Sequence, residues 1–363
     1  MIDMKKLKET MSVSSTNQFW TRTGLCLCLL AAPLAVQVHA QTITHTTDDV
    51  GDYVDINPDK SLGNPLHLPI FAPDPSAHVW ADGRLYLYPS RDTPGQKNFY
   101  GMEMWYVLST EDGVNWTNHG KIFHVDDIPW VDYKAWAPDC AYKDGTYYFY
   151  FPVNDTNTPT QNWIGVATSS SPSGPFTDPV RVRRGVDPHI FEDYEGNHWL
   201  VVNNSIERLS DDMKSIDRET RVYWHDYAAD WPNYEGWKHE GSWIFKRDGI
   251  YYLMSAGSTL EPRADGNTQK HVLHYGMSTS PTGPYAYQGV LMDTIGNPYN
   301  PSNPLNNHGS VVEYKGKWIL FYHKIWKAPD GNVHRATCAD YVTFNEDGTM
   351  NQVIPTDEGI DLR

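Results

Sequence analysis

Three carboxylic acids occupy equivalent positions in three similar stretches of the sequence. Asp74, Asp187 and Glu240 each lie nine residues before a glycine that closes a predicted turn. Glycoside hydrolysis uses such groups, because one carboxylic acid protonates the leaving oxygen while a carboxylate activates water or attacks carbon. Each acid alone would more often be structural, since Asp-Pro is a common strand-opening turn. Their shared position is what favours a catalytic role.

Two further stretches carry other side chains at or near this position. Trp136 occupies it in one stretch, and His308 lies eight residues before its glycine in the other. His308 fits a hydrogen-bonded channel histidine, a sugar contact or a ligand of an ion equally well. Arg335 is a candidate charge partner of the acids, with a plain surface arginine as the alternative. Asp139 also follows a proline but is three residues out of phase, so we interpret it as structural.

One pattern recurs five times along the chain. Each copy has a polar or acidic opening, a short strand, a turn ending in glycine and an aromatic-rich strand. Asp-Gly, Glu-Gly and Lys-Gly at the turns are typical of β-hairpins, because these turns need residues that tolerate positive φ. The five openings and turns span residues 74–83, 136–145, 187–196, 240–249 and 308–316.

A second strand-turn pattern follows four of the five hairpins, as in WYVLSTEDGVNW and IGVATSSSPSGPF. Two hairpins make a four-stranded antiparallel sheet, and five such sheets at intervals of roughly 50 to 70 residues predict a propeller. A β-sandwich, the structural alternative, does not explain why one opening recurs five times. The predicted fold is all-β: a five-bladed β-propeller, each blade a four-stranded antiparallel sheet.

A propeller would gather the five openings around one axis. Equivalent positions of its blades lie at equivalent radii, so two Asp, one Glu, one Trp and one His would meet at the mouth of the central channel. Carboxylates placed so close repel one another and raise at least one pKa. Proteins rarely bury such a cluster for stability, since removing a charge from water costs several kcal/mol. A catalytic function accounts for that cost.

The composition is that of a folded globular protein with an acidic surface. Hydrophobic residues make up 40% of the 363 residues, and the formal net charge is −16. This charge argues against a nucleic-acid partner and an anionic membrane surface, because both require basic patches. An uncharged oligosaccharide or polysaccharide fits better. The 23 Tyr, 14 Trp and 11 Phe suit strands, and a few of these rings are expected to stack on sugars.

Residues 1–40 resemble a signal peptide. Basic residues precede an apolar stretch at 24–36, GLCLCLLAAPLAV, which is too short to span a bilayer comfortably, and VHA after it resembles a cleavage site. We expect a secreted or periplasmic protein whose mature chain starts near Gln41 and has no membrane span. An uncleaved N-terminal anchor is the alternative. Residues 41–63 are polar and irregular, and 64–363 form the predicted catalytic propeller.

Two cysteines, Cys140 and Cys338, remain after the predicted signal peptide. Export would permit a disulfide between them, and their wide separation is unlike the spacing of metal ligands. Of the two interpretations, a disulfide or a pair of buried thiols, we favour the buried thiols.

Eight stretches between Phe71 and Met350 carry a further signal: FAPDPSAHVWADGRLYLY, KAWAPDCAYKDGTYYFYFP, IGVATSSSPSGPF, GVDPHIFED, HEGSWIFKRDGIYYLMSAG, YGMSTSPTGPY, NHGSVVEYKGKWILFYH and HRATCADYVTFNEDGTM. Together they resemble glycoside hydrolase family 43, five-bladed propeller enzymes that include β-xylosidases, α-L-arabinofuranosidases and arabinanases. The resemblance covers nearly the whole predicted mature chain. The combination of stretches is specific, although each alone is not.

The resemblance implies roles for the three acids. Asp74 would be the general base, Glu240 the general acid, and Asp187 the residue that orients the acid and tunes its pKa. The family inverts anomeric configuration, so a water molecule must fit between base and sugar. The resemblance therefore implies carboxyl groups roughly 6.5–9.5 Å apart.

The resemblance also implies roles for the residues around the acids. His308 matches a channel histidine that in many members helps to hold calcium or another ion through water. Arg335 matches an arginine that contacts the sugar or its acids, and Trp136 would form a wall of the −1 subsite. The chain departs from the family in its Glu-Gly-Ser at residues 240–242, where Glu-Gly-Pro or Glu-Ala-Ser is frequent. Nothing in these stretches corresponds to the C-terminal β-sandwich of the longer xylosidases, so we expect none here.

The sequence thus leads to one hypothesis and two alternatives. The hypothesis is an inverting exo-glycosidase that releases L-arabinofuranose or D-xylose from plant-type or algal oligosaccharides and polysaccharides. One alternative is a non-catalytic carbohydrate-binding propeller, against which three phased acids argue. The other is a five-bladed glycosidase of different specificity; the Asn-Asp-Pro-Asn opening of fructan enzymes is not found in the sequence.

Overall fold

The structure, a computed structural model, describes ten segments of the chain: residues 43–45, 63–94, 101–155, 158–202, 205–231, 239–257, 272–293, 307–327, 331 and 333–363. Nearly all regular structure in these segments is β. The helical elements described are one 3-10 turn, η1 (Val125–Asp127), and one short helix, α1 (Trp224–Tyr227). Neither has the length or apolar character to cross a membrane. The predicted signal peptide lies outside the described residues.

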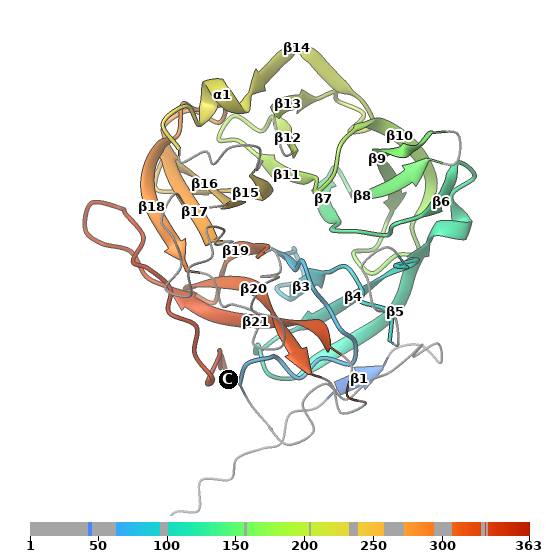
Figure 1. The fold of residues 1–363 in the computed structure, drawn as a ribbon, viewed down its shortest axis with the longest axis horizontal. Coiled ribbons are helices and arrows are strands. Elements are labelled where there is room, and N and C mark those ends of the chain that lie inside the picture. The colour runs from blue at the N-terminus through green and yellow to red at the C-terminus, as the bar shows by residue number, and fades with distance from the viewer. Residues whose placement is uncertain are drawn as a thin grey trace, which may run out of the picture. The chain divides into compact units, whose positions relative to one another are not determined.

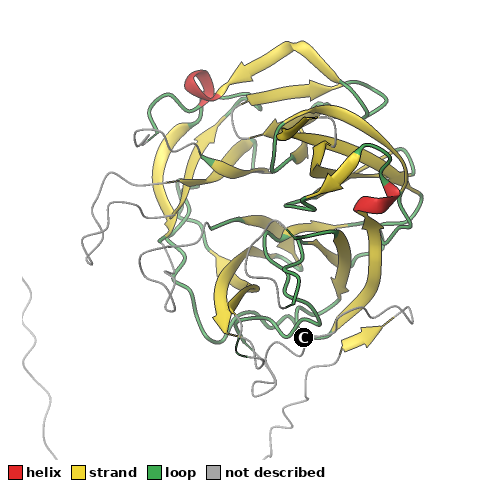
Figure 2. Ribbon diagram, turned by 45° about the vertical axis from the view of Figure 1, so that its right-hand side comes forward, coloured by secondary structure: helices red, strands yellow, loops and turns green. Residues whose placement is uncertain are grey.

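Five small sheets stand in a ring around a central axis, which confirms the predicted five-bladed β-propeller (Figures 1 and 2). Blade 1 has the strand order β1 (Ile43–His45), β5 (Trp116–His124), β4 (Met104–Thr110), β3 (Leu85–Tyr88) and β2 (Ser76–Val79). Blade 2 has the order β10 (Thr177–Arg184), β9 (Thr158–Ser169) and β8 (Thr146–Asp155), and β8 pairs with both β6 (Val131–Tyr133) and β7 (Asp139–Lys143).

The remaining blades follow the chain in simple order. Blade 3 consists of β11 (His189–Glu192), β12 (His198–Val202), β13 (Ser205–Leu209) and β14 (Ile216–Tyr223). Blade 4 consists of β15 (Glu240–Arg247), β16 (Ile250–Gly257), β17 (Val272–Ser278) and β18 (Ala286–Met292). Blade 5 consists of β19 (Gly309–Tyr314), β20 (Lys317–Lys327) and β21 (Val333–Val342). In blades 2 to 5 the first strand of the recurrent hairpin lies nearest the axis (Figure 1), and β2 of blade 1 contacts its neighbours β19 and β7.

The number of described strands differs between blades: blades 1 and 2 have five, blades 3 and 4 have the predicted four, and blade 5 has three. Blade 3 contains a second hairpin, β13–β14, although its sequence lacks the strand-turn pattern of the other second hairpins. In blade 1, β1 adds a parallel strand to β5, so part of the stretch interpreted as irregular is regular. Blade 5 has three strands among the described residues. There the N–H of Leu66 donates to the carbonyl of Thr337 in β21 at 2.8 Å.

The turns of the recurrent hairpins have the geometry that their sequences predict. Asp144 and Gly145 join β7 to β8 with φ values of 49° and 84°, and Asp248 and Gly249 join β15 to β16 with 51° and 82°. Two successive positive φ values are the signature of the type I′ turn, whose twist matches that of the flanking strands. The turn at 315–316 repeats this pattern.

Apolar side chains pack between neighbouring blades. Each of the five buried clusters combines residues from adjacent blades, so that Leu85 meets Phe321 where blades 1 and 5 join. Between blades 1 and 2, the rings of Trp105 and Phe151 lie with centroids 5.3 Å apart. Such rings each bury a large apolar area, which explains where most of the aromatic excess is used.

Both ends of the described chain join the first blade to the last. Asn64, which precedes blade 1, is fully buried and donates from Nδ2 to the carbonyl of Ala339 at 3.0 Å and to Asp340 Oδ2 at 3.1 Å. Its Oδ1 accepts from the N–H of Ala339 at 2.8 Å. After blade 5, the N–H of Leu362 donates to the carbonyl of Asp112 in blade 1 at 2.9 Å. These contacts close the ring.

The cysteines Cys140 in β7 and Cys338 in β21 are both buried and free. They belong to blades 2 and 5, so the preference for buried thiols over a disulfide is confirmed. Burial raises the pKa of the Cys338 thiol to about 12, which keeps it protonated and unreactive at neutral pH.

Candidate active site

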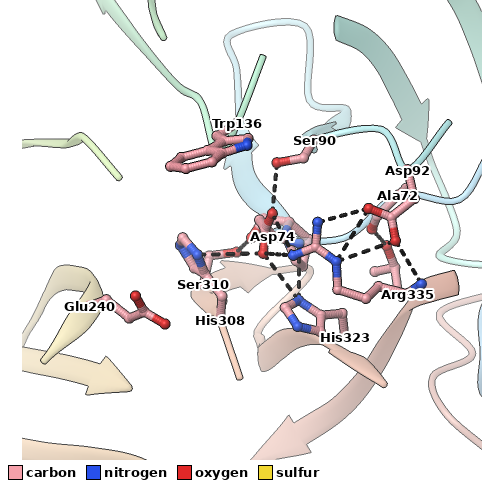
Figure 3. A network of polar contacts seen from close by, with 12 residues as sticks. Ala72, Asp74, Ser90, Asp92, Trp136, Glu240, His308, Ser310, His323 and Arg335 are labelled. Atoms are coloured by element: carbon pink, nitrogen blue, oxygen red, sulfur yellow. Dashed lines mark hydrogen bonds and ion pairs between the residues drawn. The ribbon is translucent and has the colours of Figure 1, made fainter. Parts of the chain in front are cut away.

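The five residues that open the recurrent hairpins lie at one end of the central channel. Glu240 is the first residue of β15, whereas Asp74 and Asp187 lie two residues before β2 and β11. His308 directly precedes β19, and Trp136 lies three residues before β7. Figure 3 shows the side chains of Asp74, Glu240, His308 and Trp136 around one space. The repeat therefore brings together residues that are far apart in the sequence.

Arg335 and Ser90 hold the carboxylate of Asp74 (Figure 3). Nη1 of Arg335 donates to its two oxygens at 3.0 and 3.1 Å, and the hydroxyl of Ser90 donates to Oδ2 at 2.7 Å. The backbone of Asp74 has a φ of 54°, and that of Asp187 has 51°. Asp accepts this left-handed conformation more readily than most residues, which explains why the two Asp-Pro openings are alike.

The surroundings of Asp74 favour its ionised form. Burial would raise the pKa of this carboxyl, but the Arg335 guanidinium, the rings of His323 and His308 and the Ser90 hydrogen bond lower it to about 2. Asp74 is therefore a carboxylate at neutral pH. In that state it can take a proton from water, as a general base must.

Two histidines flank the same carboxylate. Nδ1 of His323 accepts the backbone N–H of Asp74 at 3.1 Å, so this nitrogen carries no proton in that contact. Nδ1 of His308 lies 3.6 Å from Oδ1 of Asp74. Burial lowers the pKa of His308, so its ring is neutral at neutral pH. The permanent positive charge beside Asp74 thus comes from Arg335.

Asp187 and Glu240 form a pair of carboxyl groups. In contrast to the lowered pKa of Asp74, the pKa of Asp187 in this pair is raised. Burial raises the pKa of Asp187 well above its usual value, and the negative charges of Glu240 and Asp74 raise it further. The backbone N–H of Gly241 and the charge of Arg335 act against this rise. Two carboxyl groups so close share one proton at pH values where an isolated acid has lost it. The pair can therefore supply a proton near neutral pH.

The glycine after Glu240 is required by its neighbours. A Cβ on Gly241 would lie 2.8 Å from the ring carbons of His308, and the backbone φ is 58°. Only glycine accommodates both the close approach of the ring and the positive φ without strain. The Glu-Gly pair therefore places the carboxyl of Glu240, the ring of His308 and the N–H directed at Asp187 next to one another.

Trp136 forms an aromatic side of the space above Asp74 and His308 (Figure 3). It is half-buried, and its backbone carbonyl accepts the indole N–H of Trp105 at 2.8 Å. Nζ of Lys134 lies 4.8 Å from the centroid of its ring. A flat ring fixed in this way offers a stacking face to a sugar, which suits the expected subsite wall.

Three residues at the site escaped the sequence analysis: Ser90, Asp92 and His323. Asp92 accepts the backbone N–H of Arg335 and its Nη2, both at 2.8 Å, so it fixes the residue that fixes Asp74. The sequence offered one signal, polar Ser90 and Asp92 shortly after β3, where the backbone continues to pair with the stretch before β2. His323 lies in β20 at the end of a continuous buried run, residues 319–323, which looks like ordinary core.

Asp139 lies inside the channel, where it joins three blades. Its carboxylate accepts hydrogen bonds from the hydroxyl of Ser76 at 2.5 Å and the backbone N–H of Ile190 at 2.7 Å. Its oxygens also lie 2.6 Å from Nε2 of His78 and 2.9 Å from Nδ1 of His189. Burial would raise its pKa, but these contacts lower it, so the carboxylate is ionised. Bonds between blades agree with a structural role.

The surroundings of His308 do not form a direct calcium site. Calcium takes six to eight oxygen ligands. Within the described ranges, no group of three or more His, Cys, Asp or Glu side chains is placed to hold a metal ion. The Asp74 carboxylate, 3.6 Å from Nδ1 of His308, is already engaged by Arg335.

Comparison with known proteins relates this site to characterised enzymes. The family model "Glycosyl hydrolases family 43" matches residues 62–350. A xylosidase/arabinosidase 43A from Humicola insolens is 30% identical, with 79% of this chain and 98% of that protein covered. A xylosidase/arabinosidase from Bacteroides ovatus is 29% identical, with 78% and 95% covered.

Solved structures that resemble this chain also belong to family 43 enzymes. A family 43 β-xylosidase/α-arabinofuranosidase from a compost metagenome, crystallised with xylotriose in a calcium-free form, has a TM-score of 0.63 and 30% identity, covering 80% of this chain and 97% of that one. A family 43 enzyme from Xanthomonas citri has a TM-score of 0.64 and 28% identity, covering 79% and 92%. With the family model matching most of the chain, this protein belongs to glycoside hydrolase family 43.

Proposed function

We propose that this glycoside hydrolase acts as an inverting exo-enzyme that releases D-xylose or L-arabinofuranose from oligosaccharides and polysaccharides. The observation that carries the proposal is the contrast between its acids. Asp74 is kept ionised by Arg335, whereas Asp187 and Glu240 retain a proton between them. Hydrolysis by inversion needs this combination of a ready base and a ready acid.

Glu240 is the proposed general acid. Burial and the charge of Glu240 raise the pKa of Asp187, so the pair holds a proton at pH values where an isolated acid has lost it. In the proposed reaction Glu240 delivers this proton to the glycosidic oxygen as the bond to carbon breaks. Asp187 is the neighbouring acid whose charge favours protonation of the pair.

Asp74 is the proposed general base. Its carboxylate takes a proton from a water molecule while the water oxygen forms a bond to the anomeric carbon, on the face opposite the leaving group. Arg335 and Ser90 fix the carboxylate, so its orientation does not have to be established during the reaction. Trp136 would stack on the sugar and hold it between the two groups.

The choice of sugar rests on the relatives. The Humicola insolens and Bacteroides ovatus proteins are named as xylosidase/arabinosidases, and a relative from Xylanibacter ruminicola, 29% identical, is named as a β-xylosidase. Substrates in which xylose or arabinose is the terminal residue are therefore the first to test.

The test is hydrolysis of nitrophenyl β-D-xyloside and nitrophenyl α-L-arabinofuranoside by the wild type and by Asp74→Ala, Asp187→Ala and Glu240→Ala. Asp74→Ala should lower kcat by about 10²- to 10⁴-fold on the sugar that the wild type accepts, as expected for removal of the general base. Asp187→Ala and Glu240→Ala should lower kcat less on these substrates, because nitrophenolate needs little help from an acid to depart. Full activity in Glu240→Gln would end the assignment. NMR of the first product formed should show the anomer opposite to that of the substrate.

We also propose that the protein is exported and that calcium binds in the channel through water near His308. Export is supported by the signal-like residues 1–40, and N-terminal sequencing of the protein from culture medium or periplasm should give a start near Gln41. The calcium proposal is supported by the match between His308 and a channel histidine that helps to hold an ion through water in many family 43 enzymes. Chelation should lower activity and added calcium should restore it; activity unchanged by chelation would contradict the proposal.

A further inference from the structure

A hollow of about 400 Å³ lies at the other end of the central channel. The inner strands of all five blades contribute to its lining, and these strands run away from the catalytic end. Trp80 directly follows β2, Tyr142 lies near the end of β7, and Glu192 ends β11. Lys246 in β15 and Glu313 in β19 complete the rim. A pocket of this size can accept a ligand as large as one or two sugar rings.

A polar layer separates this hollow from the catalytic end. His78 and His189 line the hollow, and both contact the carboxylate of Asp139. Asp139 is 1% exposed and also accepts the hydroxyl of Ser76, two residues after Asp74. This buried, hydrogen-bonded layer lies between the hollow and the catalytic end, and none of the three acids lines the hollow, so we treat the hollow as a separate site.

Aromatic rings form one side of the hollow. Tyr142 is 41% exposed, which is unusual for a tyrosine on an inner strand. Its ring lies 6.5 Å from that of Trp80 and 4.9 Å from that of Tyr147, centroid to centroid. Trp318 lines another side. Rings with an apolar face and a polar tip are suited to ligands that combine C–H faces with hydroxyl groups.

A second hollow of about 570 Å³ adjoins the first, and His198 lines both. Its lining is predominantly polar. The charged groups there balance one another, since Lys143 lies 3.9 Å from Asp211 and Arg208 lies 3.1 Å from Asp217. In the first hollow, one cation, Lys246, faces two acids, Glu192 and Glu313, which leaves a single negative charge. Such a lining offers hydrogen bonds without selecting a strongly charged ligand.

We propose that the two adjoining hollows bind a neutral oligosaccharide and form a second, non-catalytic sugar site on the face opposite the active site. The aromatic hollow would stack against one or two sugar rings, and the polar hollow would take the hydroxyl groups of the next. The choice of pentose oligosaccharides as ligand rests on the proposed function. A site here would keep a long polysaccharide bound while its ends are hydrolysed elsewhere.

The test compares Tyr142→Ala with Tyr223→Ala, a control at a tyrosine that is 43% exposed on the outer strand β14. Both changes are made in the Glu240→Gln background, and binding of xylohexaose and of α-1,5-arabinohexaose is measured by calorimetry. We expect two sites in the Glu240→Gln protein and in the control. Tyr142→Ala should weaken one site about tenfold, the loss of one stacking contact of about 1.4 kcal/mol. Tyr142→Phe, which keeps the ring, should bind like the control.

Hydrolysis of the nitrophenyl glycosides separates this proposal from the proposed function. Tyr142→Ala with Glu240 intact should hydrolyse them like the wild type but should act more slowly on the polysaccharide at low concentration. A single binding site for both hexaoses, or two sites unaffected by Tyr142→Ala, would overturn the second site while leaving the enzymatic activity intact. A wild type that binds at two sites and hydrolyses neither glycoside would instead overturn the proposed function alone.

Discussion

Arg335 lies between two buried carboxylates, Asp74 and Asp92, and is itself 3% exposed. A buried ion pair is costly to form, because both charges lose water. Here the arrangement gives the catalytic end a carboxylate that stays ionised and is fixed on both sides. Nothing in the local sequence around Arg335 showed that Asp92 would be its second partner, since the two residues are 243 positions apart.

The pH profile should report the coupling between Asp187 and Glu240. The pKa of Asp187 is raised, so the proton of the pair, and with it kcat/KM, is lost as pH rises through the raised value. Asp187→Asn removes the like charge, so the basic limb of kcat/KM should move to lower pH, with a lower maximum. Asp193→Asn, at an acid of the same blade away from the site, serves as control. A basic limb at the wild-type pH in Asp187→Asn would contradict the coupling.

At the scale of elements, the hairpins were predictable because their signals are local. Asp144-Gly145 and Asp248-Gly249 form the expected turns, since few other residues adopt two positive φ values in succession. The hairpin formed by β13 and β14 was not predicted, because its turn contains no glycine. Met213 adopts the positive φ of this turn instead, at 59°. The parallel pairing of β1 was also not predicted, because a strand of three residues is too short to show the alternation of apolar and polar side chains.

A buried carboxylate joins blades 2 and 3 at their outer strands. Glu207 in β13 is fully buried and forms ion pairs with Arg183 of β10 and Arg221 of β14. Glu207→Gln should lower the free energy of unfolding by about 2–3 kcal/mol, because it leaves two guanidinium groups without their charge partner. Asp217→Asn, at an exposed ion pair with Arg208, should cost less than about 1 kcal/mol. Urea denaturation measures the free energy of unfolding of both variants. Equal small losses would mean that Glu207 does not hold blades 2 and 3 together.

At the scale of the whole molecule, the number of blades followed from counting repeats, but the closure of the ring did not. Propeller symmetry determines that the first and last blades must meet, and it does not say which residues join them. Asn64 and Leu362 lie outside the recurrent pattern and contact partners 275 and 250 positions away. Long-range pairings of this kind leave no periodic trace in a sequence. The convergence of the acids, by contrast, follows from symmetry alone.

Closure of the ring should depend strongly on Asn64. Its amide makes hydrogen bonds to Ala339, Asp340 and the carbonyl of Thr356, and Asn64 itself is fully buried. Asn64→Ala should destabilise the protein by about 2–4 kcal/mol, because several buried partners lose their hydrogen bonds together. Thermal unfolding measures this as a fall in Tm. Asn345→Ala, at an exposed turn in the same blade region, should change stability by about 0.5 kcal/mol or less; a similar Tm for both variants would contradict the closing role.

The central claim is that Glu240 delivers a proton to the leaving oxygen while Asp74 activates water. The most direct measurement is kcat/KM of Glu240→Gln on two substrates of the accepted pentose, one a disaccharide and the other a dinitrophenyl glycoside. The dinitrophenolate departs without protonation, whereas a sugar alkoxide does not. We expect a loss of about 10²- to 10⁴-fold on the disaccharide and a much smaller loss on the dinitrophenyl glycoside. Equal losses on both substrates, or no loss on the disaccharide, would contradict the role of Glu240 as the acid.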